Sequence, residues 1–204
     1  MVERQLRHRG IGDERVLAAM GRVPRELFVP EAERREAYVD GALPIGGGQT
    51  ISQPLMVATM LELASVEPGD RVLDVGTGSG YAAAVLAELG AVVTSIERIP
   101  ALARSAAAAL REAGYSGVDV RVGDGSLGTP DEAPFDAILV AAAAPEPPRA
   151  LESQLRLGGR LVVPVGSRYE QRLVCVVRTE RGPETTASVP CRFVPLLGAE
   201  GFAR

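Results

Sequence analysis

Arg71-Val72-Leu73-Asp74-Val75-Gly76-Thr77-Gly78-Ser79-Gly80-Tyr81 is the stretch that decides the fold. An apolar run breaks into three alternating glycines, and the alanine-rich residues 82–89 follow at once. This order predicts a strand, a tight turn and the start of a helix. Glycines at such a turn let the backbone approach a ligand, and the helix offers unpaired N–H groups to it. The stretch therefore predicts a binding turn, the alternative being glycines that serve only the turn.

The spacing of the glycines narrows the class of ligand that the turn is expected to bind. A dinucleotide fingerprint needs its third Gly or Ala at position 81, which is occupied here by Tyr81. The pattern is G-x-G-x-G instead, and this disfavours a nicotinamide-dependent oxidoreductase.

Strand-like and helix-like runs alternate after this turn, an order typical of a mostly parallel sheet with helices on both faces. Three later strand-like runs have only turns between them, which predicts antiparallel pairing at one edge. We therefore predict an α/β, doubly wound, Rossmann-like sheet with an antiparallel C-terminal edge and a helical N-terminal extension. The alternating runs are 72–75, 80–89, 91–96, 100–113, 118–122, 135–140 and 147–155, and the late strands are 160–165, 172–178 and 187–194.

Acidic residues stand at the ends of two predicted parallel strands, where ligands of such sheets bind. Glu97 ends the second strand, and Asp124-Gly125 follows the third. Both are candidate ligand contacts. The alternatives are that Glu97 only pairs with Arg98 and that Asp124 only shapes an Asp-Gly turn.

Two segments precede the glycine turn. Residues 1–40 predict short helices, with Asp13 as the N-cap of 14–20, and their apolar spacing predicts packing onto the core. Residues 37–54 are rich in glycine and predict an irregular, mobile loop. Ser52 stands where it would cap a helix over 55–66, and the residues fit capping alone and capping plus function equally well.

Composition excludes several classes of function. The 204-residue chain has a net charge of −4, contains no lysine and has a single histidine, His8. It therefore lacks a Schiff-base lysine, and its acidity argues against nucleic-acid binding. Cys175 and Cys191 lack metal-site spacing, so we predict no metal. No 18-residue apolar run or signal sequence occurs, which predicts a cytoplasmic protein without a membrane span.

The segment Leu43-Pro44-Ile45-Gly46-Gly47-Gly48-Gln49-Thr50-Ile51-Ser52-Gln53-Pro54 closely resembles the hallmark of protein-L-isoaspartate O-methyltransferases. The glycine turn and Glu97 resemble the first motifs of class I S-adenosylmethionine-dependent methyltransferases. The resemblance covers most of the chain and continues through 123–126, 133–136, 158–166 and 193–196. Two departures are Ala141, where many members have Thr, and Thr129, where many have Trp.

The resemblance implies methyl transfer from S-adenosyl-L-methionine to the free α-carboxylate of L-isoaspartyl and D-aspartyl residues, with S-adenosyl-L-homocysteine as product. The ester then collapses to a succinimide, which begins repair of the damaged protein. Ser52 matches the active-site serine of the family, and Thr50 lies in the same triplet. The implied cofactor contacts are Asp74, Gly76, Thr77, Gly78 and Gly80 at the amino-acid end, Glu97 at the ribose with Arg98 beside it, and Asp124 and Gly125 at the adenine.

The chemistry suits this sparse set of side chains. A carboxylate is already ionised at neutral pH, so its methylation needs no general base. It needs an in-line approach and a site that excludes water, and Ser52 and Thr50 can donate hydrogen bonds without adding charge. The alternatives are a methyltransferase of the same fold with an RNA-base or small-molecule acceptor, and a non-catalytic isoaspartyl-binding adaptor.

We predict one methyltransferase domain over 1–204, acting as a monomer on isoaspartyl-containing proteins and peptides. Within it, 1–52 form the helical preface and active-site loop, 53–166 the cofactor-binding core and 167–204 the C-terminal strands.

Overall fold

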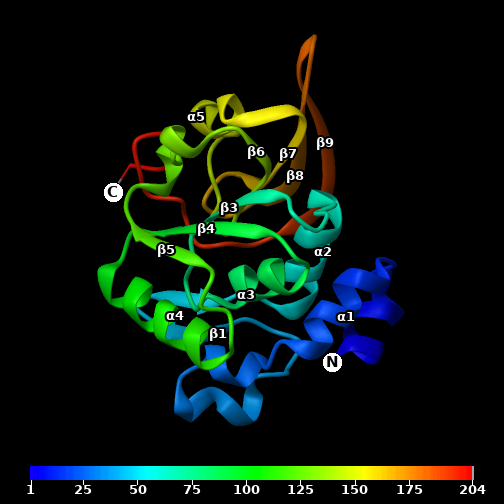
Figure 1. Ribbon diagram of the computed structural model, residues 1–204, viewed down its shortest axis with the longest axis vertical. Helices are drawn as coiled ribbons and strands as arrows, with labels where there is room; N and C mark the ends of the chain where they lie inside the picture. Colours follow the sequence, from blue (N-terminus) through cyan, green and yellow to red (C-terminus); the bar gives the residue numbers. More distant parts are fainter. Residues whose placement is uncertain (204) are drawn as a thin grey trace.

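A computed structural model describes residues 1–203, except the side chains of Ala187 and Ser188, and its centre is a seven-stranded sheet (Figure 1). The strand order is β5-β4-β3-β6-β7-β8-β9. The first five of these run parallel, and β8 and β9 pair antiparallel at one edge. This confirms the predicted fold class. The bounds are β3 Arg71–Val75, β4 Val92–Glu97, β5 Asp119–Val122, β6 Phe135–Val140, β7 Leu155–Gly166, β8 Gln171–Thr179 and β9 Gly182–Cys191.

The central strands are mostly apolar because both faces of the sheet are covered. Successive side chains of a strand point to opposite faces, so Val72 packs into one core and Leu73 into the other. The first core lies under α1, α2 and α3 together with the end of α4, and the second lies under α5. The helices are α1 Glu14–Arg22, α2 Pro54–Ala64, α3 Tyr81–Glu88, α4 Pro100–Glu112 and α5 Arg149–Ser153.

The order of the strands determines where a ligand can bind. From β3 the chain proceeds to β4 and β5 on one side, and β6 and β7 lie on the other. The loops after β3 and β6 therefore separate, and a crevice opens beyond the carboxyl ends of the strands. The glycine turn, Glu97 and Ala141 all lie at this crevice.

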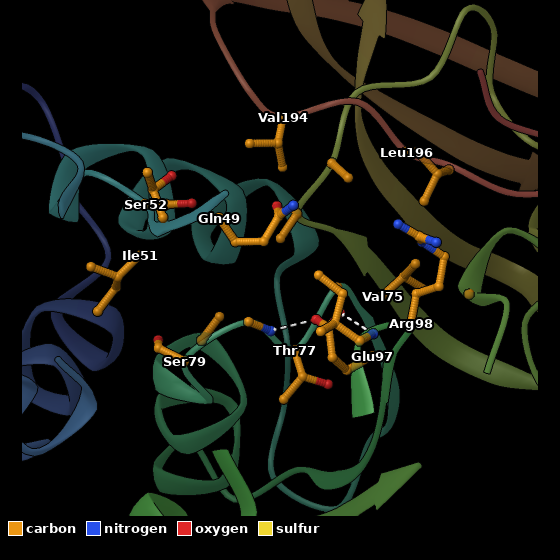
Figure 2. A pocket seen from close by; sticks show the side chains of 18 of the residues that line it. Gln49, Ile51, Ser52, Val75, Thr77, Ser79, Glu97, Arg98, Val194 and Leu196 are labelled. Carbon is orange, nitrogen blue, oxygen red and sulfur yellow. Dashed lines mark hydrogen bonds between the residues drawn. The ribbon is translucent and has the colours of Figure 1, made fainter. Parts of the chain in front are cut away.

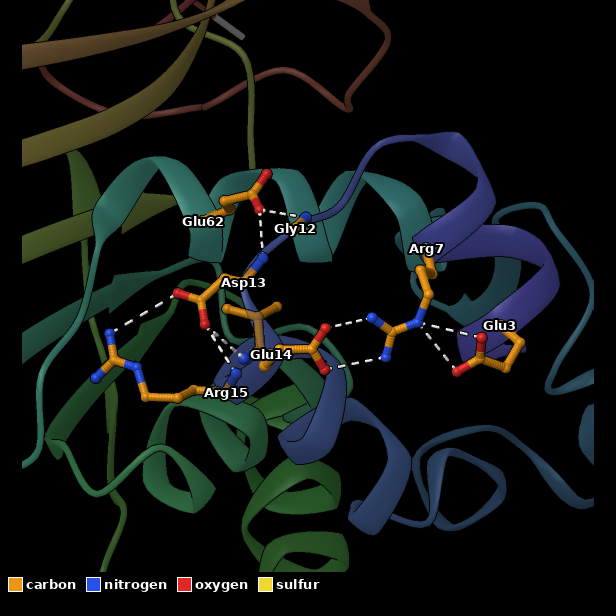
Figure 3. A network of polar contacts seen from close by, with 8 residues as sticks. Glu3, Arg7, Gly12, Asp13, Glu14, Arg15 and Glu62 are labelled. Carbon is orange, nitrogen blue, oxygen red and sulfur yellow. Dashed lines mark hydrogen bonds and ion pairs between the residues drawn. The ribbon is translucent and has the colours of Figure 1, made fainter.

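The N-terminal extension consists of short helical turns around α1, and polar contacts attach it to α2 (Figure 3). Asp13 caps α1 by accepting from the backbone N–H of Arg15 at 2.8 Å, which confirms the predicted cap. The carboxylate of Glu62 in α2 accepts from the N–H groups of Gly12 and Asp13, each at 2.8 Å. The short turns are η1 Val2–Leu6, η2 Arg7–Arg9, η3 Arg25–Phe28 and η4 Glu31–Glu36.

A two-stranded hairpin occupies the segment that we predicted to be irregular, so that prediction is wrong. Strands β1 Leu43–Gly46 and β2 Gln49–Ile51 pair antiparallel, with Gly47 and Gly48 between them at φ of 60° and 72°. The consecutive glycines therefore make a tight turn rather than a free loop, because only glycine adopts such angles without strain. A Cβ on Gly78 would lie 3.5 Å from Ile45 Cδ1, so the hairpin packs over the glycine turn.

The segment after β9 returns to the centre of the molecule. The N–H of Ala143, just beyond β6, donates to the carbonyl of Val194 at 2.8 Å, and the N–H of Leu196 donates to the carbonyl of Ala143 at 2.7 Å. This brings residues 194–197 to the crevice. Over residues 1–203, every helix is too short or too polar to cross a bilayer. The boundaries at 52/53 and 166/167 stay a prediction.

Candidate active site

A cleft opens beyond the ends of β3, β4 and β6, and we call it the glycine-turn cleft (Figure 2). It encloses about 860 Å³ when measured out to its opening, which suits a small-molecule ligand. Its walls come from the hairpin, the turn after β3, the end of β4, the segment after β6 and the C-terminal segment. The lining residues are Gln49, Thr50, Ile51, Ser52, Val57, Val75, Gly76, Thr77, Gly78, Ser79, Tyr81, Ala82, Ile96, Glu97, Arg98, Ile99, Gly125, Ala141, Ala142, Val194, Pro195, Leu196 and Leu197.

The glycine turn forms one wall with its backbone. Gly76 and Gly78 have φ of 89° and 54°, values that side chains with a Cβ adopt only with strain. Helix α3 follows with Gly80 as its N-cap, a residue without a side chain that could cap the helix. The N–H of Tyr81 donates to the Ser79 hydroxyl at 3.2 Å, and the rest of the first turn of α3 keeps N–H groups available for a polar ligand.

Glu97 is the buried acid of the cleft, with only 6% of its surface exposed. One carboxylate oxygen accepts from the N–H of Gly78 at 2.9 Å, and the other accepts from the N–H of Ile99 at 2.8 Å. Figure 2 shows both bonds. A carboxylate has about four acceptor positions, so two remain for hydroxyl groups of a ligand. Arg98 lines the cleft as well, and neither oxygen of Glu97 is paired with it.

A buried chain of hydroxyl groups lies behind the glycine turn. The Ser95 hydroxyl donates to the Asp74 carboxylate at 2.6 Å and lies 2.5 Å from the hydroxyl of Thr77. Asp74 is 1% exposed and does not line the cleft, and burial raises its pKa to about 6. The chain of hydrogen bonds therefore fixes Thr77, which does line the cleft, from below.

The prediction that Ser52 caps α2 is wrong. The N-cap is Gln53, and α2 begins at Pro54, which occupies the first helical position. Proline is well suited to that position because it lacks an N–H and has a fixed φ. The N-cap position therefore lies one residue after Ser52, and Ser52 lines the cleft instead of capping the helix.

A second, larger opening adjoins the cleft, and we call it the neighbouring cavity. It encloses about 1130 Å³ when measured out to its opening. Four residues line both spaces: Thr50, Ser52, Ala141 and Val194. The rest of its lining comes from Arg9, Ala42, Gln53, Leu55, Met56, Thr59, Val189, Pro190, Cys191, Arg192 and Phe193.

Gly125 lines the glycine-turn cleft, whereas Asp124 does not. The Asp124 carboxylate accepts from the hydroxyl of Ser126 at 2.7 Å and from the N–H of Ala199 at 2.8 Å. Burial opposes its ionisation, but these bonds outweigh burial and hold the pKa of Asp124 below its ordinary value. Asp124 thus anchors the C-terminal segment, and its contact with an adenine stays a prediction.

The site contains residues that we did not predict from the sequence. Gln49, Ser79 and the C-terminal residues Val194 and Leu196 line the cleft. Val194 and Leu196 carry no reactive group and lie more than fifty positions after the preceding wall at Ala142, so no spacing in the sequence points to them. The run at 193–196, which is part of the family resemblance, is the one signal that could have found them.

Comparison with known proteins identifies the family. The sequence profile of the family described as protein-L-isoaspartate (D-aspartate) O-methyltransferase matches residues 1–201. A protein-L-isoaspartate O-methyltransferase from Methanoculleus marisnigri is 56% identical over 202 residues, covering 99% of this chain and 92% of that protein. Protein-L-isoaspartate O-methyltransferase 2 from Marinobacter nauticus is also 56% identical and covers 99% of this chain and 93% of that protein.

Solved structures agree with the sequence comparison. A protein-L-isoaspartate O-methyltransferase structure superposes with a TM-score of 0.88 at 28% identity, over 98% of this chain and 67% of that chain. A second such structure, from Plasmodium falciparum in complex with S-adenosyl-L-homocysteine, gives a TM-score of 0.84 at 27% identity over 96% of both chains. The resemblance inferred from the hairpin segment and the glycine turn is thereby confirmed, and the chain belongs to the protein-L-isoaspartate (D-aspartate) O-methyltransferase family.

Proposed function

We propose that this chain transfers the methyl group of S-adenosyl-L-methionine to the free α-carboxylate of L-isoaspartyl and D-aspartyl residues in damaged proteins and peptides. The observation that carries the proposal is the junction of two spaces at Thr50, Ser52, Ala141 and Val194. A cofactor in the glycine-turn cleft and a peptide in the neighbouring cavity would meet only there. The reacting groups could then approach in line, which such a transfer requires.

The residues of the glycine-turn cleft fit the cofactor. The free acceptor positions of Glu97 suit ribose hydroxyls, and the N–H groups at the start of α3 suit the carboxylate of the methionine end. Gly125 also lines the cleft, and a Cβ at this position would lie 2.6 Å from Val75 Cγ1. When bound, S-adenosyl-L-methionine supplies an electrophilic methyl group on a sulfonium centre. The related structure that contains S-adenosyl-L-homocysteine supports this assignment.

We assign Ser52 and Thr50 to the substrate carboxylate. Their hydroxyls can donate hydrogen bonds that orient the attacking oxygen without withdrawing its charge. The carboxylate is ionised at neutral pH, so no residue has to remove a proton. Ala141 and Val194 complete the junction with apolar surface, which helps to exclude water from the nucleophile.

The methyl ester leads to repair without further help from the protein. The neighbouring backbone nitrogen attacks the ester carbonyl and expels methanol, which leaves a succinimide. Water then opens this ring to aspartyl or isoaspartyl linkages, and the isoaspartyl product is methylated again. Action as a monomer in the cytoplasm, without nucleic-acid or membrane partners, stays a prediction from the sequence.

The test is transfer of labelled methyl from S-adenosyl-L-methionine to a synthetic peptide that contains one L-isoaspartate. The control is the same peptide with normal aspartate, since the two differ only in the linkage. We expect base-labile label on the isoaspartyl peptide alone. Equal labelling of both peptides, or of neither while calorimetry shows cofactor binding, would contradict the proposed acceptor.

Ser52→Ala tests the role of the serine. We expect kcat with the isoaspartyl peptide to fall on the order of 10- to 100-fold, because a hydrogen bond to a charged group contributes about 1.5–3 kcal/mol. The dissociation constant of the cofactor should stay within about threefold, since the first turn of α3 and Glu97 are unchanged. Ser153→Ala is the matched control, because Ser153 bonds to the Ala150 carbonyl in α5 and does not line the cleft. Loss of cofactor affinity with unchanged kcat would contradict the assignment.

A further inference from the structure

A buried arginine lies behind the junction of the two spaces, and neither the family resemblance nor the cavity walls assign it a role. Arg25 begins η3 in the N-terminal extension, and its side chain is 0% exposed. It lines neither the glycine-turn cleft nor the neighbouring cavity. Its guanidinium nevertheless contacts residues of three separate segments.

Two backbone carbonyls receive the hydrogen bonds of this guanidinium. Arg25 Nε donates to the carbonyl of Ala37 at 2.7 Å, and Nη2 donates to the carbonyl of Ser52 at 2.7 Å. The second contact fixes the backbone of Ser52, a residue that lines both spaces at their junction. Ser52 lies between the end of β2 and the start of α2, where its carbonyl belongs to neither element.

The third contact is with the glycine-turn cleft. Arg25 Cζ lies 4.7 Å from the centroid of the Tyr81 ring, within the range of a cation–π interaction. Tyr81 is the first residue of α3 and lines the cleft. The ring of Phe28 also contacts the ring of Tyr81, in an edge-to-face arrangement with the two centroids 5.8 Å apart. The Arg25 guanidinium therefore connects Tyr81, in the wall of the glycine-turn cleft, with Ser52, at the junction of the two spaces.

Stability does not explain this arrangement. Among residues 1–203, no carboxylate forms an ion pair with Arg25. Arg25 Nη1 and the Tyr81 hydroxyl are both buried without a well-formed hydrogen bond, and the guanidinium and the phenol are polar neighbours of each other at that point. Burial lowers the pKa of Arg25, as expected for a cation removed from water. A buried charge without a counter-ion destabilises a fold relative to an apolar side chain of similar volume. The contacts with Ser52 and Tyr81 therefore need another explanation.

We propose that Arg25 is a positioning residue for methyl transfer, which holds the Ser52 backbone against the Tyr81 wall so that the Ser52 hydroxyl stays at the junction of the two spaces. It acts through Ser52 and does not touch the reacting groups. The inference rests on the proposed function, because it requires Ser52 to orient the carboxylate. A misplacement of about 1 Å at such a site is enough to cost up to 100-fold in rate.

A double-mutant cycle between Arg25→Met and Ser52→Ala tests the proposal. Methionine keeps much of the volume and loses both hydrogen bonds. We expect Arg25→Met to lower kcat with the isoaspartyl peptide on the order of 10- to 100-fold, and the Kd for S-adenosyl-L-homocysteine to change by less than about threefold. In the Ser52→Ala background the same change should lower kcat by less than about threefold, because the hydroxyl that it positions is already absent.

Two further variants separate positioning from a general loss of structure. Leu151→Ala removes a buried side chain from α5 in the other core, and it serves as the control for lost stability. If Arg25→Met does not fold, Arg25→Lys replaces it in the cycle, since an ammonium group keeps the charge but cannot reach both carbonyls in the same fork geometry. We expect Leu151→Ala to keep the wild-type kcat below its melting temperature.

The outcomes are distinguishable. If Arg25→Met lowers kcat by the same factor in the wild type and in Ser52→Ala, the inference is overturned and the proposed function still stands. A loss of kcat in Leu151→Ala as large as in Arg25→Met also overturns it, because then any destabilisation produces the effect. If Ser52→Ala alone keeps the wild-type kcat, the role of Ser52 is wrong and the inference fails with it. If the wild-type protein does not methylate the isoaspartyl peptide, the proposed function itself fails.

Discussion

Glu97 illustrates how a single side chain can stabilise the fold and still present acceptor atoms to a cleft. Its two oxygens accept from the N–H groups of Gly78 and Ile99, which fixes the glycine turn against the end of β4. The same carboxylate lines the cleft, and about two of its four acceptor positions are not used by the backbone. The sequence predicted its place at the strand end, but not its bonds to the backbone, because these depend on the close approach of two loops.

Glu97→Gln should weaken cofactor binding. The amide keeps one acceptor but turns N–H donors toward a backbone N–H or a ribose hydroxyl. We expect the Kd for S-adenosyl-L-methionine to rise on the order of 10- to 100-fold, from hydrogen bonds to a charged group worth about 1.5–3 kcal/mol. Calorimetry measures this, and Glu88→Gln is the control because Glu88 pairs with Arg22 and Tyr115 outside the cleft. Equal Kd values in both variants would exclude Glu97 from the cofactor site.

Asp74 makes stability depend on pH in an unusual direction. Burial, assisted by the charge of Glu97 and opposed by the Ser95 hydrogen bond, raises the pKa of Asp74 from 3.8 to about 6. The folded protein therefore binds this proton more tightly than the unfolded chain does. The contribution of Asp74 to the free energy of unfolding is greatest below the unfolded pKa and declines as pH rises toward 6, by at most about 1.4 kcal/mol per pH unit.

Asp74→Asn removes this contribution while keeping an acceptor for Ser95. Urea unfolding between pH 4 and 7 should show stability falling less steeply with pH in the variant than in the wild type. Parallel curves for the two proteins would show that the proton is not held at Asp74.

At the scale of elements, the hairpin β1–β2 carries the active-site segment, and its turn depends on glycine. Gly48 has a φ of 72°, and a Cβ added there would meet no atom within 4 Å. Any effect of a substitution is therefore conformational. Because the hairpin packs over the glycine turn and ends at Ser52, strain at its tip reaches the junction of the two spaces.

Gly48→Ala should cost about 1–2 kcal/mol of hairpin stability, the penalty of a left-handed conformation for a residue with a Cβ. We expect kcat/KM for the isoaspartyl peptide to fall about tenfold as strain in the turn displaces Thr50 and Ser52 from the junction. Gly117→Ala is the matched control, since its Cβ also meets no atom within 4 Å and its φ is not positive. If both variants behave alike, the geometry of the turn does not limit catalysis.

The same segment shows how far sequence reasoning reaches. The glycines and the Ser52-Gln53-Pro54 order pointed to a segment that lines the cleft, but the pairing of Leu43 with Ile51 depends on contacts that no local pattern reveals. Ser52 was misassigned as a cap because a serine before an apolar run is a common helix start. Pro54 decides otherwise, since the helix begins at the proline itself.

At the scale of the whole molecule, the cleft joins parts that are distant in the chain. The parallel sheet with its antiparallel edge, and a ligand site at the carboxyl ends of the strands, follow from the alternation of strands and helices, and the sequence predicted both. The order of the strands in the sheet was not predicted. The return of residues 194–197 over Ala143 does not follow from any periodicity, because two backbone hydrogen bonds and apolar contacts determine it. The contacts of Arg25 were missed for the same reason.

Asp124→Ala tests how the C-terminal segment is held at the cleft, because the Asp124 carboxylate accepts hydrogen bonds from the N–H of Ala199 and from the Ser126 hydroxyl. We expect the C-terminal segment to loosen and the Kd for S-adenosyl-L-homocysteine to rise about tenfold, from the loss of charge-assisted hydrogen bonds worth about 1.5–3 kcal/mol. Asp131→Ala, at an exposed carboxylate in η6 (Pro130–Glu132), is the control. Unchanged affinity in Asp124→Ala would show that the segment stays in place without this anchor.

The late position of that wall has a consequence during synthesis. The glycine turn, Glu97 and Ser52 have all been translated before the chain reaches residue 100, yet Val194 to Leu197 are added about a hundred residues later. A growing chain that has been translated only as far as β9 therefore lacks one side of the cleft, although every other wall has already been made.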